Sequence, residues 1–246
     1  MSPPNAAQTA RERVRAELTR EIRQEARRQL AEAGANGLSL RAVARELGMV
    51  SSALYRYYPS RDDLLTALII DAYNAIGAAA EAAAHQVGAA RAGTGAGPPA
   101  RETWAAACRA IRAWAVANPH EYALIYGSPV AGYRAPEATI GPASRVPLAF
   151  ASILEAAVAS GTAGASALSG TLAAQAAALA AALPVTPGAS DAPAIPADML
   201  VRAVIAWTQL FGMISFELFG QFVGSFEPAD AFFDHAVAQL AAFIGL

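Results

Sequence analysis

The chain has 246 residues, 55% of them hydrophobic, which is enough for one large domain or two smaller ones. Its single cysteine, Cys108, excludes an intrachain disulfide and fits a reducing cytoplasm, and we expect no secretory signal in the polar N-terminus. Residues 1–61 hold 11 arginines against 6 acidic residues, whereas residues 62–246 hold 7 against 14. A basic end on an acidic body suggests that one end meets a polyanion, although an ordinary charged surface would look the same.

The first predicted element is a helix from about Ala10 to Ala33, which follows a disordered tail of residues 1–9. Gly34 is a suitable C-cap residue for it. Apolar side chains recur at every fourth position, as expected for one buried helix face, at Val14, Leu18, Ile22, Ala26 and Leu30.

Two short helices follow, separated by a turn at Gly48. Ser39 is a suitable N-cap for the first of them. Its buried face is predicted to comprise Leu40, Val43, Ala44 and Leu47. The second is predicted over residues 51–57, anchored inward by Ala53 or Leu54 and ended by Pro59.

A longer helix is predicted from the N-cap Ser60 to about His85, because Asp62 and Asp63 in its first turn suit the helix dipole. The later helices are predicted around Trp104–Trp114, closed by Asn118-Pro119, and over residues 145–160, 171–183, 198–223 and 228–244. Breaks or loops are predicted at residues 88–100, 128–144, 161–170 and 183–197. No stretch alternates β-branched residues, so the predicted fold class is all-α.

The mean hydropathy of +0.31 raises the question of a membrane span. The best candidate, Ala203 to Phe219, has 17 residues and includes Gln209 and Glu217, whereas a span needs roughly 20 mostly apolar residues. A buried or subunit-facing helix is the preferred interpretation.

Residues 39–65 have the arrangement that places side chains in a DNA major groove: a helix, a tight turn and a second, polar-faced helix. The small residues Ser51 and Ser52 allow a close approach to base edges, and Arg56 could bond a guanine or a phosphate. Phosphate contacts, which set register without reading sequence, are expected at the helix ends from Ser39, Tyr57 and Arg61.

This segment resembles the N-terminal domain of TetR-type transcriptional regulators. The resemblance covers about residues 12–65 and rests on Ser39-Leu40-Arg41, Val43-Ala44, Leu47-Gly48, Ala53-Leu54-Tyr55 and residues 59–65, PSRDDLL. It implies a homodimer, a recognition helix at residues 51–57 and a C-terminal domain that binds a small molecule. The implied organisation is a three-helix DNA-binding domain at residues 10–59, joined by a long helix to a helical effector-binding and dimerisation domain within residues 60–246.

By position, the resemblance implies phosphate contacts from Ser39, Tyr57 and Arg61, with Arg56 open between base and phosphate. It implies base contacts from Arg41, Ser51, Ser52, Ala53 and Tyr55. Met49 stands where valine is usual and Tyr57 where histidine is frequent, so the operator sequence cannot be taken from a relative. Core packing remains the alternative for the two tyrosines, and simple solvation for the arginines.

The C-terminal half resembles domains named for a Trp-His-Gly motif, at Trp207 through Phe211-Gly212 and at residues 119–136. Phe211 stands where histidine is expected, which puts a polar ligand contact from this position in doubt. Large aromatics among alanines favour an apolar cavity. Its candidate lining residues, each of which could equally be core, are Trp104, Cys108, Tyr122, Tyr126, Phe150, Leu154, Trp207 and Phe211.

Dimerisation is assigned to the last two helices. Residues 200–222 are apolar nearly all round, and one core cannot cover every side, so a partner subunit is expected to cover the rest. A central buried helix in a monomer is the alternative.

Together these patterns predict a cytoplasmic regulator that represses transcription and is released from a palindromic DNA operator by a small apolar or aromatic ligand, without a cofactor. A dimeric DNA-binding regulator without an effector, or an activator, remains open. An enzyme is disfavoured, because Cys108 and His120 are the only nucleophile and base worth pairing, and Asn118-Pro119 separates their segments. The three histidines lack metal-ligand spacing.

Overall fold

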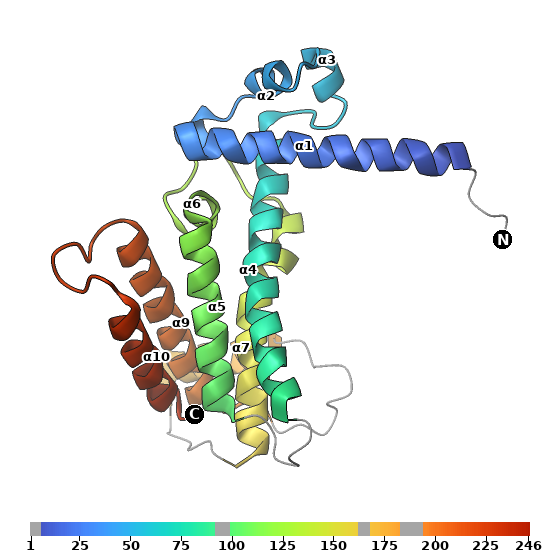
Figure 1. Cartoon of the computed structure of the whole chain (residues 1–246). Coiled ribbons are helices and arrows are strands. Elements are labelled where there is room, and N and C mark those ends of the chain that lie inside the picture. The colour runs from blue at the N-terminus through green and yellow to red at the C-terminus, as the bar shows by residue number, and fades with distance from the viewer. Residues whose placement is uncertain (1–5, 92–98, 162–167, 183–193) are drawn as a thin grey trace. The chain divides into compact units, whose positions relative to one another are not determined.

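The computed structural model describes residues 6–91, 99–161, 168–182 and 194–246, which form helices and connecting turns without a strand (Figure 1). The all-α prediction is therefore confirmed for this part of the chain. Contacts divide the chain into two compact units. The N-terminal unit comprises residues 1–73 and 118–140, and the C-terminal unit comprises residues 74–117 and 141–246.

The N-terminal unit is built around a helix-turn-helix. Its elements are α1 (Ala6–Gly37), α2 (Leu40–Glu46), α3 (Ser51–Leu54), the first part of α4 (Arg61–Arg91), α6 (Pro119–Tyr126) and the 3-10 helix η1 (Glu137–Thr139). Its core is apolar and includes the predicted Ile22, Leu30, Val43 and Leu54, together with Leu64, Leu65 and Leu68 of α4. The apolar stripe predicted for the first helix is thus buried from Ile22 onward, whereas Val14 is 64% exposed.

Gly34 breaks the helical path of α1 near its end. Its φ of 66° and ψ of 177° are accessible almost only to glycine, and the residues on either side of it are helical. The helix predicted to end at Ala33 therefore changes direction at Gly34 and continues to Gly37.

The C-terminal unit is a helical bundle. Its elements are the rest of α4, α5 (Ala100–Ala117), α7 (Ile140–Ala159), α8 (Gly170–Ala182), α9 (Ala197–Leu218) and α10 (Asp230–Ile244). Helices α9 and α10 lie side by side and both contact α5 (Figure 1). The core includes Trp104 and Ile111 of α5, Leu154 of α7 and Ile214 of α9, all at most 1% exposed.

Polar contacts fasten α5 to the last two helices. The buried Trp104 Nε1 donates to the carbonyl oxygen of Val237 at 3.3 Å. Arg112 donates to both carboxylate oxygens of Glu217, at 2.7 and 2.6 Å, and to Asp230 at 2.9 Å. Its guanidinium also lies over the ring of Phe233, 4.9 Å from the centroid. Arg112 therefore connects α5 to both α9 and α10.

Several helix limits differ from the prediction. Helix α1 begins at Ala6 rather than Ala10, while residues 1–5 of the predicted tail lie outside the described residues. Helix α3 ends at Leu54 rather than residue 57, and α4 continues to Arg91, into the predicted break at residues 88–100. Residues 92–98, 162–167 and 183–193, on which the predicted loops fall, are not described.

One further segment predicted as a loop is partly helical, because α7 begins at Ile140 instead of residue 145. Residues 119–126, for which no element was predicted, form α6, with Pro119 in its first turn. The functional division at residues 59 and 60 concerns DNA binding and effector binding rather than contacts, and it stays a prediction.

The apolar stretch considered as a membrane span lies in α9, which has 22 residues, ends at Leu218 and is shorter than the helix predicted over residues 198–223. Both α9 and residues 61–90 of α4 are long and apolar enough to cross a membrane by length and composition alone. In the most apolar windows, 44% of the α4 residues and 39% of the α9 residues are buried within the protein. Core helices of non-membrane proteins meet the same criterion, so this observation is weak evidence for a span.

Candidate nucleic-acid interface

The turn between α2 and α3 is set by a cap, a glycine and a buried leucine. Ser39 caps α2, because its hydroxyl accepts a hydrogen bond from the backbone N–H of Ala42 at 3.4 Å. Gly48 has a φ of 65°, in the left-handed region that favours glycine. Leu54, which is 0% exposed, is the buried residue of α3, so this short helix is held to the core mainly by one side chain.

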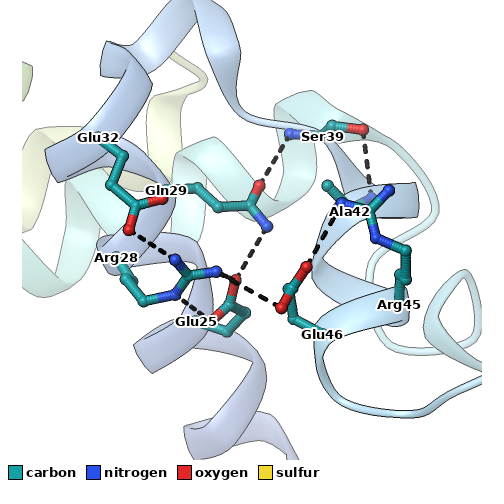
Figure 2. A network of polar contacts seen from close by, with 8 residues as sticks. All are labelled: Glu25, Arg28, Gln29, Glu32, Ser39, Ala42, Arg45 and Glu46. Carbon is teal, nitrogen blue, oxygen red and sulfur yellow. Dashed lines mark hydrogen bonds and ion pairs between the residues drawn. The ribbon is translucent and has the colours of Figure 1, made fainter.

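A polar network fixes α2 against α1 (Figure 2). Gln29 is only 7% exposed; its amide nitrogen donates to Glu25 at 3.0 Å, and its amide oxygen accepts the backbone N–H of Ser39 at 3.4 Å. Arg28 lies between Glu25 and Glu32 of α1, at 2.7 and 2.6 Å, and approaches Glu46 of α2 at 3.9 Å. The network orients the helix that precedes the reading segment.

A second group of charges ties α1 to α4. Arg23 donates to the hydroxyl of Tyr58 at 2.7 Å and to the carboxylate of Asp71 at 2.8 Å. Arg27 donates to the other oxygen of Asp71 at 2.7 Å and lies 3.6 Å from Glu121 of α6. Asp71 therefore accepts from two arginines, and the segment following α3 is anchored through Tyr58.

The predicted base-reading side chains lie on the outer side of α2 and α3. Those of Arg41, Ser51, Ser52, Tyr55 and Arg56 are exposed, and Tyr55 is 42% exposed. Ala53 is half-buried. Among the described residues, Arg41 and Arg56 make no ion pair. They are therefore available to an external anion, as the prediction requires.

The predicted phosphate-contacting residues are half-buried and have partners within the unit. Arg61 donates to the carbonyl oxygens of Ala35 at 2.7 Å and of Leu38 at 3.2 Å. Tyr57 packs against the core, and the guanidinium of Arg15 lies 5.6 Å from its ring centroid. Arg61 thus clamps the turn between α1 and α2, a structural role that competes with the predicted phosphate contact.

The predicted ligand-lining residues lie in both units and are mostly packed. Tyr122 and Tyr126 belong to the N-terminal unit, with ring centroids 5.3 Å apart. The other six belong to the C-terminal unit. There the rings of Trp104 and Phe150 are 4.6 Å apart, and those of Trp207 and Phe211 are 6.0 Å apart. The buried residues of the set are Trp104, Cys108, Tyr122, Phe150, Leu154 and Phe211, whereas Tyr126 and Trp207 are half-buried.

Two features of the C-terminal unit could serve a ligand. The first is an open cleft of 280 Å³ between α4, α5 and α7, lined by Glu81, Ala84, Ala100, Thr103, Ala149, Ser152, Ile153 and Ala156. These residues were not among the predicted lining residues, which were mostly large aromatic side chains, whereas half of the residues that line the cleft are alanines. The second is the indole nitrogen of Trp207, which is buried without a hydrogen-bond partner among the described residues.

The chemistry required of an enzyme is not supported at Cys108. Its thiol is buried, and burial raises the pKa of Cys108 well above its ordinary value. A nucleophilic cysteine needs the opposite shift. Within the described part of the chain, no group of three or more histidine, cysteine, aspartate or glutamate side chains could hold a metal ion.

Comparison with known proteins identifies the family. The family described as "Bacterial regulatory proteins, tetR family" matches residues 22–68, and "Tetracyclin repressor-like, C-terminal domain" matches residues 104–240. The HTH-type transcriptional regulators Rv1816 of Mycobacterium tuberculosis and Mb1846 of Mycobacterium bovis are each 41% identical over 226 residues, covering 87% of this chain and 84% of theirs. The chain belongs to the TetR family.

Solved structures agree with this assignment. The crystal structure of the proposed regulatory protein SCO4313 superposes with a TM-score of 0.70 at 35% identity, covering 94% of this chain and 98% of that one. A Rhodococcus sp. RHA1 protein of unknown function shares the fold, with a TM-score of 0.63 at 23% identity. This TetR-family chain is thus a DNA-binding transcriptional regulator and not an enzyme. The resemblance to the Trp-His-Gly subgroup stays a prediction, since neither matched family carries that name.

Proposed function

We propose that this TetR-family regulator is a repressor that a small apolar or aromatic ligand releases from a palindromic operator in the cytoplasm. The observation that carries the effector part of this proposal is the open cleft in the C-terminal unit. Its volume of 280 Å³ lies just below the range of roughly 300–1,000 Å³ typical of ligand pockets, which favours a small molecule. Its wall is mainly alanine and isoleucine, with Glu81, Thr103 and Ser152 as polar groups.

TetR-family regulators typically dimerise, and we place the interface on α9 and α10. The exposed face of α9 carries Val204 and Ile205, which are 40% and 42% exposed, and Phe216, which is 54% exposed; Phe219 at its C-cap is 49% exposed. Gly212 lies on the same face with nothing within 4 Å of an added Cβ, so a partner helix could approach closely there. Phe243 of α10, 44% exposed, adds to the apolar surface.

A cluster of phenylalanine rings lies at the connection between α9 and α10. The rings of Phe226 and Phe232 stack with centroids 4.4 Å apart, and Phe222 lies 5.3 Å from Phe232 and 5.9 Å from Phe216. Phe226 is 53% exposed and the neighbouring Val223 is 72% exposed. A soluble monomer rarely leaves so many large apolar side chains in contact with water, which supports a covering subunit.

On DNA, two copies of α3 would occupy successive major grooves about 34–36 Å apart. We assign base contacts to Arg41, Ser51, Ser52, Ala53 and Tyr55 and phosphate contacts to Ser39, Tyr57 and Arg61, with Arg56 open between the two. Arg56→Ala should cost roughly 1–3 kcal/mol on one operator and relax specificity if Arg56 reads a base, whereas an equal loss on random DNA would make it a phosphate contact.

Arg61 needs a test that separates its two roles. If it binds a phosphate, Arg61→Ala should lower the slope of log K against log salt concentration by about 0.9 for each phosphate that is no longer neutralised. If it serves only to clamp Ala35 and Leu38, the variant should melt at a lower temperature with an unchanged slope, and the phosphate assignment would be rejected.

Ligand release is proposed to act through α4. Glu81 and Ala84 of this helix line the cleft, while Leu64 and Leu65 of the same helix lie in the core beneath the reading segment. A ligand that binds one position of α4 better than another would shift the population of DNA-binding conformations.

The proposal is tested by operator selection from random DNA, followed by melting with a panel of small apolar and aromatic compounds. Selection should yield a palindrome, and a true effector should raise the melting temperature and weaken operator binding. Ala84→Phe, which fills the cleft, should abolish the ligand-induced rise, whereas Ala82→Phe at an exposed position of the same helix should not. Trp207→Phe keeps an aromatic ring and deletes the N–H, so a weaker ligand response would place the effector at Trp207.

The alternatives give different results. A regulator without an effector would bind its palindrome but show no ligand-induced stabilisation across the panel. A reporter gene placed behind the selected operator decides the sign of regulation, since a repressor lowers expression and an activator raises it.

A further inference from the structure

The arginines of the basic N-terminal region divide into those with internal partners and those without. Internal hydrogen bonds or ion pairs occupy Arg20, Arg23, Arg27, Arg28, Arg45 and Arg61. Within the described residues, no side-chain ion pair or hydrogen bond is made by Arg11, Arg13, Arg15, Arg41 and Arg56, although the guanidinium of Arg15 contacts the ring of Tyr57. Arg41 and Arg56 belong to the reading segment, whereas the other three lie at the start of α1, outside the predicted contact surface.

Two of the α1 arginines share the face of the helix that packs against the core. Residues three and four positions apart lie on one helix face, so Arg11, Arg15, Leu18 and Ile22 form a single stripe. Ile22 is 0% exposed and Leu18 packs against the same core, whereas Arg11 and Arg15 are exposed. Arg13 lies about 200° around the helix from Arg15 and therefore points to the opposite side.

Arg15 shows that this face of α1 lies close to the end of α3. Its guanidinium carbon lies 5.6 Å from the ring centroid of Tyr57, which follows the recognition helix α3. In Figure 1 the N-terminal half of α1 continues past α3. The free arginines on this face thus adjoin the reading segment and extend beyond it.

We propose that Arg11 and Arg15 bind DNA backbone phosphates that flank the bases read by α3. Guanidinium groups bind phosphate oxygens through charge-assisted hydrogen bonds. One helical turn separates the two residues by about 6 Å along α1, and a DNA strand carries a phosphate per roughly 3.4 Å of axis, so the pair spans neighbouring phosphates. The proposal rests on the DNA binding of the TetR family and is independent of ligand release.

The test compares the double variant Arg11→Ala/Arg15→Ala with Arg13→Ala. Affinities for a selected operator and for random DNA are measured across salt concentrations, without ligand. Removing one arginine–phosphate pair should lower the slope by about 0.9, so the double variant should show a decrease of about 1.8 per subunit. Between 50 and 200 mM salt, its affinity should therefore fall roughly 12-fold less per subunit than that of the unmodified protein. Arg13→Ala should leave the slope unchanged.

The results distinguish a direct arginine–phosphate contact from a general effect of positive charge, and from an indirect effect of losing the contact between Arg15 and Tyr57. Equal slopes for the double variant and Arg13→Ala would overturn the proposal, as would a loss of affinity confined to the operator. Arg11→Ala alone should lower the slope by about 0.9, and this variant leaves the contact between Arg15 and Tyr57 in place. An unchanged slope for this variant would overturn the assignment of Arg11.

Discussion

Replacing Leu54 should weaken operator binding while most of the protein stays folded. It is 0% exposed and is the buried residue of α3, a helix of four residues. Leu54→Ala removes three buried carbon atoms, worth roughly 0.8 kcal/mol each, and leaves a cavity that adds to the loss. We expect a loss of about 3 kcal/mol in the free energy of unfolding of the N-terminal unit.

Hydrogen exchange is the suitable assay, because it reports the local opening free energy of amides in α2 and α3. Trp104, Trp114 and Trp207 all lie in the C-terminal unit, so tryptophan fluorescence checks separately that this unit is folded. Operator affinity is measured at a temperature at which both signals are those of the folded protein.

Leu68→Ala is the matched control. Leu68 is 1% exposed in the same core but belongs to α4, so it should cost a similar unfolding free energy with a smaller loss of specific binding. The proposed role of Leu54 is refuted if Leu54→Ala costs less than about 1 kcal/mol, which is outside the usual range for a buried leucine. It is also refuted if both variants weaken operator binding equally.

Gly34→Ala should destabilise by about 1–3 kcal/mol in urea unfolding, because its φ of 66° and ψ of 177° suit only glycine, whereas Gly141→Ala in α7 should not. The hydrogen bond from Arg28 holds the pKa of Glu25 below its ordinary 4.5, so this stabilisation is present above pH 4.5 and lost as pH falls through the folded-state pKa. Glu25→Gln should therefore lower the melting temperature at pH 7, and this effect should shrink as the pH falls below 4.5; an effect of constant size would refute this. Because burial raises the pKa of Cys108, iodoacetamide at pH 8 should label it only after unfolding; rapid labelling of the native protein would contradict the packing of α5.

The sequence was sufficient for the features that depend on local chemistry. The cap at Ser39 follows from its hydroxyl, the turn at Gly48 from the freedom of glycine, and the burial of Leu54 from the spacing of apolar residues. The structure confirms all three. These features also carried the family resemblance, because the spacing of packing residues is what a TetR-type domain shares.

The features that depend on tertiary partners could not be read in the same way. Tyr57 and Tyr58, which follow the end of α3 at Leu54, pack against the core, and a helical pattern over residues 51–57 does not reveal this. The clamp of Arg61 onto Ala35 and Leu38 requires the fold to bring these residues together across more than 20 positions. The sequence does not indicate whether an alanine packs in the core or, like Ala84, lines a cleft.

The apolar surface of α9 and α10 has a consequence for how the regulator responds to its own abundance. If this surface pairs two copies, and only a pair spans both halves of a palindrome, the concentration of the active species rises with the square of the monomer concentration at low expression. A twofold change in synthesis would then alter operator occupancy up to fourfold. Phe216 and Phe226 would thereby set the expression threshold at which the target genes respond.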